Sequence, residues 1–206
     1  VISNIVYPPF FHSIAFFDTK CNYGGETMKK QYIIPIFVPH LGCPNDCSFC
    51  NQKSISGKTK MPTKNHIILP MWLDDYIFNT LSATFEKKCK DLVVLNWDAT
   101  DIQCYLGTYF PRSFAESYGI FSQYFQKNRN DYDSQTELTI FDFGCGTGGE
   151  LIGLIAALNE NLENLQEVKI YALDGNYHSL RYLELILSES KKYLHFDILR
   201  VWAYLP

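Results

Sequence analysis

The stretch IFDFGCGTGGE, residues 140–150, constrains this chain more than any other part of it. A run rich in β-forming residues leads into it, and LIGLIAAL, whose apolar residues have helical spacing, follows it. Between them lie four glycines, at positions 144, 146, 148 and 149. The sequence therefore predicts a strand, a tight glycine turn and a helix N-terminus, where free backbone N–H groups and the positive dipole end favour a bound ligand.

A second strand pattern, VKIYALD at residues 168–174, ends in the carboxylate of Asp174. In a nucleotide-binding βαβ unit, an acid at the end of the second strand accepts hydrogen bonds from the ribose hydroxyls. Glycine turns occur wherever a strand meets a helix, so it is Asp174 that favours a nucleotide site. The spacing of Gly144, Gly146 and Gly148 is GxGxG rather than GxGxxG, which disfavours a dinucleotide.

The pattern DxGxGxG, opened by Asp142, together with Asp174 resembles motifs I and II of class I S-adenosylmethionine (SAM) methyltransferases. This resemblance implies an α/β fold with a Rossmann-like sheet over residues 65–206. It implies that SAM is bound by Asp142, Gly144, Cys145, Gly146, Thr147, Gly148, Asp174, Gly175 and Asn176. In this family later strands face the transferred methyl group, so we expect an N-terminal half truncated at its C-terminus. The acceptor, whether RNA, protein or a small molecule, and the catalytic residues stay unassigned.

Three cysteines, Cys43, Cys47 and Cys50, form a second motif, CxxxCxxC, directly after the apolar strand pattern IIPIFVPH. Three thiolates on a short loop can hold three irons of a [4Fe–4S] cluster. Zinc sites usually combine CxxC pairs with a fourth ligand, and His40 and His66 lie at unsuitable spacings.

Residues 28–64 resemble the start of elongator-type radical SAM proteins, which implies a cluster at these cysteines. The resemblance ends before the barrel that such enzymes need, so we expect cluster binding without radical chemistry. The polar, basic stretch at residues 57–66 marks a boundary. Residues 1–27 show no sustained period, and Gly24 to Thr27 can be encoded by a purine-rich ribosome-binding sequence. We interpret residues 1–27 as a poorly ordered leader or extension.

The rest of the chain predicts helices and one more strand. Apolar residues at helical spacing follow residue 67, and Pro111 suits the first turn of a second helix. Residues 127–137 predict a polar loop before the first strand. Asn176 is a suitable N-cap for a helix after Asp174, and residues 193–206 contain a third strand pattern.

Composition limits the classes of function. The chain has 206 residues, 47% of them apolar, a net charge of −4 and no basic cluster for nucleic acid. No apolar run is long enough to span a bilayer, and seven cysteines suit a reduced, cytoplasmic compartment. We expect a SAM-dependent methyltransferase with a small-molecule cofactor. The alternatives are a radical SAM fragment binding a [4Fe–4S] cluster, or an inactive fusion of two truncated reading frames.

Overall fold

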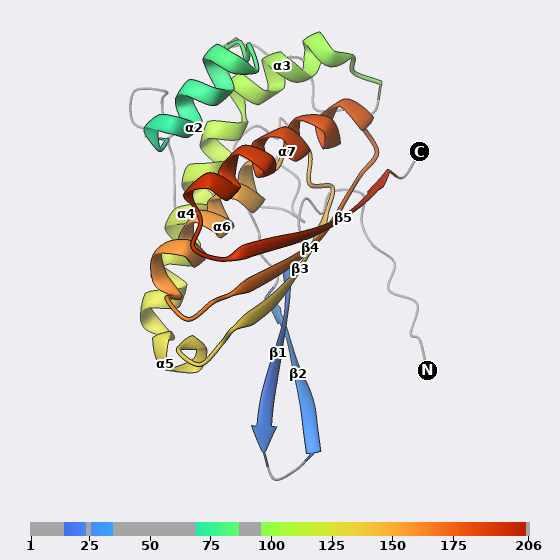
Figure 1. The fold of residues 1–206 in the computed structure, drawn as a ribbon. Coiled ribbons are helices and arrows are strands. Elements are labelled where there is room, and N and C mark those ends of the chain that lie inside the picture. The colour runs from blue at the N-terminus through green and yellow to red at the C-terminus, as the bar shows by residue number, and fades with distance from the viewer. Residues whose placement is uncertain (1–14, 24–25, 35–68, 87–95, 205–206) are drawn as a thin grey trace, which may run out of the picture.

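The computed structural model describes residues 15–23, 26–34, 69–86 and 96–204 (Figure 1). In the two N-terminal strands it describes the backbone alone. Cys43, Cys47 and Cys50, and with them the predicted cluster loop, lie outside these residues. No group of histidine, cysteine or acidic side chains in the described part of the chain is placed to hold a metal ion.

A parallel three-stranded sheet forms the centre of the described C-terminal part (Figure 1). Its strands are β3 (Glu137–Phe143), β4 (Glu167–Asp174) and β5 (Asp197–Tyr204), in the order β3-β4-β5. The predicted α/β fold with a parallel sheet, Rossmann-like in kind, is thereby confirmed. Because side chains alternate along a strand, every second residue of β4 is buried, from Val168 to Asp174.

Two helices connect the three strands. Helix α6 (Gly149–Asn161) joins β3 to β4, and α7 (Tyr177–Ser190), followed by the short 3-10 helix η3 (Lys191–Tyr193), joins β4 to β5. Parallel neighbours need such crossovers, because a tight turn cannot bring the chain back to the same end of the sheet. Both helices bury apolar residues against the sheet, among them Leu154, Leu158, Leu183, Ile186 and Leu187.

Helix α4 (Phe110–Lys127) lies directly against α6, and small residues set the distance between them. A Cβ at Gly149 would lie 2.9 Å from the carbonyl oxygen of Phe110, and one at Gly153 only 2.5 Å from that of Phe114. The hydroxyl of Ser117 donates to the backbone carbonyl of Glu150 at 2.7 Å. The close approach fixes where the glycine loop enters α6.

Further helices precede strand β3 in the chain. They are α2 (Met71–Asp75) with its π-helical continuation η2 (Tyr76–Thr80), α3 (Ala99–Thr108) and the short α5 (Arg129–Tyr132). The predicted first helix is present but ends at Thr80, and Ser82 follows with φ at +57°. Pro111 lies in the first turn of α4, as the sequence predicts, because proline at this position loses no intrahelical hydrogen bond.

Near the N-terminus, β1 (Ala15–Tyr23) and β2 (Glu26–Ile34) pair as an antiparallel hairpin. The sequence predicts no strand in residues 1–27, so β1 was not foreseen. The predicted strand at 33–38 shares its first two residues with β2, and the remainder lies outside the described residues. The hairpin is a separate sheet from β3-β4-β5.

The face of the parallel sheet that points away from α6 and α7 carries partly exposed apolar side chains. Phe141 and Tyr171 stack across β3 and β4, with ring centroids 4.7 Å apart. Phe143, Leu199 and Val201 are 43%, 46% and 50% exposed. Parallel strands are usually covered on both faces, and in the described part of the chain this face is the less buried one.

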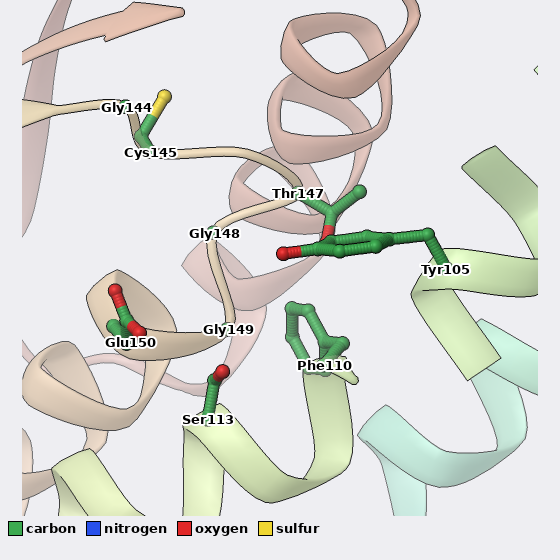
Figure 2. Close-up of a pocket in the computed structure, with 9 residues that line it drawn as sticks. All are labelled: Tyr105, Phe110, Ser113, Gly144, Cys145, Thr147, Gly148, Gly149 and Glu150. Atoms are coloured by element: carbon green, nitrogen blue, oxygen red, sulfur yellow. The ribbon is translucent and has the colours of Figure 1, made fainter. Parts of the chain in front are cut away.

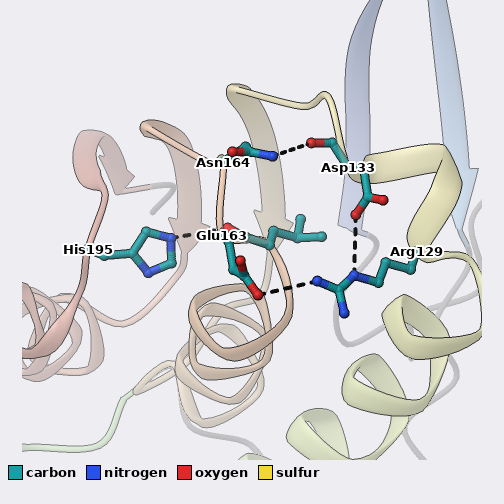
Figure 3. A network of polar contacts seen from close by, with 6 residues as sticks. Arg129, Asp133, Glu163, Asn164 and His195 are labelled. Atoms are coloured by element: carbon teal, nitrogen blue, oxygen red, sulfur yellow. Dashed lines mark hydrogen bonds and ion pairs between the residues drawn. The ribbon is translucent and has the colours of Figure 1, made fainter.

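Polar contacts join the two segments that lead into β3 and β4, at the amino ends of these strands (Figure 3). Arg129 pairs with Asp133 at 3.4 Å and with Glu163 at 3.2 Å, and the Asn164 side chain donates to the backbone carbonyl of Asp133. Both ion pairs are exposed, and such pairs contribute little to stability. These contacts lie at the opposite end of the strands from the glycine loop.

Among the described helices, none combines the length and apolar character needed to cross a bilayer.

Candidate functional site

The glycine loop follows β3 directly and turns through three residues with positive φ. Gly144, Gly146 and Gly148 have φ values of +74°, +52° and +83°. Residues with a Cβ are disfavoured in this region, so the turn requires glycine at these positions. The N–H groups of Gly144 and Cys145 donate to the carbonyl of Leu173 at 2.8 and 3.2 Å, which fastens the loop to the end of β4.

Asp174, the last residue of β4, reaches across to this loop. Its Oδ2 accepts a hydrogen bond of 2.7 Å from the N–H of Gly146, and its Oδ1 accepts one of 2.7 Å from the N–H of Asn176. A carboxylate oxygen has two lone pairs, so each oxygen keeps capacity for a further donor. The structure thus brings the predicted loop and the predicted acid together at the carboxyl ends of two neighbouring strands.

Asn176 occupies the predicted N-cap position of α7. Its Oδ1 accepts from the N–H of Ser179 at 2.9 Å, and its side chain is almost completely buried. Gly175 lies in the bend between Asp174 and Asn176 and is partly exposed. Asp142, at the end of β3, is also buried.

The three loop glycines have different surroundings. A Cβ at Gly148 would lie 2.2 Å from Cδ1 of Leu183 on α7, so Gly148 permits close packing between loop and helix. A Cβ at Gly146 would point to the other side, at 3.6 Å from the hydroxyl oxygen of Tyr105. The space in which a ligand can be held lies on the Tyr105 side of the loop. Gly148 is in its lining, and the open side of Gly146 faces Tyr105.

That space is a small cavity between the loop, α3 and α4 (Figure 2). Tyr105 lies over the loop near Thr147, and Phe110 and Ser113 of α4 line the side. The cavity volume is about 20 Å³, which is room for about one water molecule. A larger ligand therefore requires the Tyr105 side chain to rotate away from the loop.

The surroundings of the cavity are acidic. The charged residue in the described lining is Glu150, in the first turn of α6, and its side chain is negatively charged. Burial raises the pKa of the Cys145 thiol well above its ordinary value, and the nearby charges of Asp142, Asp174 and Glu150 raise it further. Cys145 is therefore protonated at neutral pH and does not serve as a thiolate nucleophile.

Comparison with protein-family models, with curated proteins and with solved structures finds no match. The site must accordingly be judged on its own geometry. The structure brings together Asp142, the glycine loop with Cys145 and Thr147, and the segment 174–176. It leaves the three N-terminal cysteines outside the described residues.

Five residues of the cavity lining were not assigned to the site from the sequence: Tyr105, Phe110, Ser113, Gly149 and Glu150. Tyr105 and Phe110 lie in an aromatic-rich helical stretch, in which spacing alone does not single out the side chains that line a cavity. The loop also contains the pattern GxGxxG, which Gly149 completes with Gly144 and Gly146, so the predicted exclusion of a dinucleotide by spacing does not hold. Glycine spacing therefore does not separate the SAM prediction from the dinucleotide alternative.

Proposed function

We propose that the glycine loop and Asp174 bind S-adenosylmethionine and that the chain serves in methyl transfer. The observation that carries the proposal is the hydrogen bond between the N–H of Gly146 and Oδ2 of Asp174. It joins a left-handed glycine turn and a strand-end carboxylate at the place where open α/β sheets bind nucleotides. The strand order β3-β4-β5 supports this, since the first three strands of a doubly wound sheet are arranged so.

Electrostatics favours SAM over a dinucleotide at this site. A pyrophosphate carries negative charge, and it would lie against Glu150 with Asp142 and Asp174 close behind the loop. SAM carries a sulfonium and an ammonium group, which acidic surroundings stabilise by direct charge attraction. The described lining contains neither lysine nor arginine.

The residues present fit the ligand in two respects. Asp174 retains lone pairs for the ribose hydroxyls after accepting from Gly146 and Asn176. Gly146 has no side chain between the loop and Tyr105, so backbone and ligand can approach closely there. Tyr105, the aromatic residue of α3, can supply a flat surface for the nucleoside once its side chain rotates.

When bound, SAM supplies an electrophilic methyl group on sulfur. The contribution of the described residues is to hold and orient the nucleoside, and alignment of this kind is a large part of the rate enhancement in displacement reactions. Cys145 stays protonated and does not compete as an acceptor.

Calorimetric titration of the full chain with SAM tests the proposal, with NAD as the competing ligand class. We expect binding of SAM and none of NAD. Asp174→Ala should weaken SAM binding by about 1–3 kcal/mol, since it removes a charged acceptor for ribose hydroxyls. Asp197→Ala, an exposed acid at the start of β5, is the matched control and should leave the affinity unchanged. Equal affinity in both variants contradicts the proposal.

A further inference from the structure

Two hydrogen bonds of the Asn176 side chain are described, and one of them belongs to its role as a helix cap. Its Oδ1 accepts from the N–H of Ser179 at 2.9 Å, which is the cap. Its Nδ2 donates to the backbone carbonyl of Trp97 at 3.0 Å. Trp97 is 79 positions away in the sequence and lies just before α3. The second bond therefore joins the end of β4 to the start of α3.

Capping alone does not explain an asparagine at this position. Serine and aspartate cap helices about as well, but they offer no amide donor. Asn176 is 2% exposed, and the Trp97 carbonyl would lose its partner if the amide were absent. A buried carbonyl without a donor is destabilising, so the amide fixes the backbone at Trp97.

The fixed segment carries the aromatic surface over the glycine loop. The Trp97 ring meets the Tyr105 ring edge-on, with centroids 6.0 Å apart at 71°. Tyr105 in turn is the nearest neighbour on the open side of Gly146. Asp98, the N-cap of α3, accepts from the N–H groups of Thr100 and Asp101 and keeps this helix start regular.

These contacts form a closed circuit at the carboxyl ends of β3 and β4, and Tyr105 is its member in the cavity lining. From Asp174 it runs through Gly146 to Tyr105, on to Trp97, and back through Asn176, whose own N–H donates to Asp174. We propose that Asn176 is a positioning residue for the cofactor, setting the Trp97–Tyr105 wall opposite the carboxylate. The inference rests on the proposed function. Because the amide holds the backbone at Trp97, the Tyr105 side chain can rotate to admit a nucleoside while the start of α3 keeps its place.

Asn176→Ser isolates the amide bond, since serine retains a capping oxygen and lacks the donor. Asn161→Ser is the matched control: the Asn161 amide also donates to a backbone carbonyl, that of Ala157 at 2.8 Å, at the far end of α6. Hydrogen exchange followed by mass spectrometry reports on the backbone of residues 96–109 in the ligand-free full chain. Calorimetry with S-adenosylhomocysteine reports on the site.

We expect Asn176→Ser to speed exchange in residues 96–109 and to leave β4 and α6 unchanged. The dissociation constant for S-adenosylhomocysteine should rise about fivefold, the change that corresponds to one net hydrogen bond. Asn161→Ser should alter neither quantity. If Asn176→Ser does not fold, Asn176→Thr provides the same test, since threonine also retains a capping oxygen and lacks the amide donor.

Unchanged exchange in residues 96–109 overturns the inference even if the wild-type protein binds tightly. Faster exchange with an unchanged dissociation constant also overturns it, because the bond would then be structural only. A wild-type protein that binds no S-adenosylhomocysteine removes the proposed function, and the positioning role falls with it. The two failures are thus distinguished by the wild-type titration.

Discussion

Gly153 faces the carbonyl oxygen of Phe114 so closely that a Cβ on Gly153 would lie 2.5 Å from it. One turn earlier on α6, Gly149 faces the carbonyl of Phe110 in the same way. The two glycines are four residues apart and thus lie on one face of the helix. This face allows α4 to approach α6 and so fixes the helix that begins at the glycine loop.

Gly153→Ala should destabilise the fold by about 1–3 kcal/mol, because the added methyl group meets backbone that cannot move without shifting α4. The measurement is the free energy of unfolding in urea. Gly119→Ala on α4 is the control, since a Cβ there meets nothing within 4 Å. Replacement of a glycine inside a helix by alanine without a clash should stabilise the protein by about 0.5–1 kcal/mol. The same sign for both variants would contradict the packing described for α4 and α6.

Gly148 and Leu183 should show strong coupling in a double-mutant cycle. Gly148→Ala forces a methyl group to within 2.2 Å of the Leu183 side chain and also meets a positive φ. Leu183→Ala alone leaves a cavity and should cost about 2–5 kcal/mol. In the double variant the methyl group enters the vacated space, so the combined loss in unfolding free energy should be smaller than the sum of the two. Additive losses would contradict the contact between these residues.

Gly146→Val should abolish SAM binding at a moderate cost in stability. The side chain would fill the space between loop and Tyr105, while its contacts with Tyr105 begin at an ordinary 3.6 Å. The strain comes instead from the positive φ, which costs about 1–2 kcal/mol for a residue with a Cβ. Calorimetry with SAM and urea unfolding on the same variant separate the two effects. Retained affinity would place the ligand elsewhere than over Gly146.

The elements around the loop were predictable because each has a local signal. Residues close together in the sequence are enough to predict the alternating burial of β4, the glycine turn and the cap at Asn176. The first strand and the crossover helix were found for the same reason. The hairpin partner β1 was missed, since its residues lack a sustained alternation.

Contacts between distant segments were not predictable. The bond from Asn176 to Trp97 and the position of Tyr105 over the loop depend on how α3 packs, which no local pattern encodes. The acidic character of the cavity likewise arises only when Asp142, Asp174 and Glu150 come together. Sequence spacing suggested a nucleotide site, but the charge that distinguishes between ligands required the structure.

Cys145 should make the stability of the fold depend on alkaline pH. Its buried thiol has a pKa raised well above the ordinary value of 9.0, by burial first and by the charges of Asp142 and Asp174 next. In the unfolded chain the thiol ionises near its ordinary value, while in the folded protein it stays protonated. Above pH 9.0 the folded state therefore holds one proton more, and stability is lost as pH rises.

The measurement is urea unfolding of the wild type and of Cys145→Ala between pH 7 and 10. The difference in unfolding free energy between the two should be constant at the lower pH values. Above the ordinary thiol pKa, the wild type should lose up to about 1.4 kcal/mol per pH unit relative to the variant. Cys104→Ala, which removes a partly buried thiol elsewhere in the chain, is the matched control for the loss of a cysteine. A difference that stays constant across the range would show that Cys145 ionises as readily in the folded protein as in the unfolded chain.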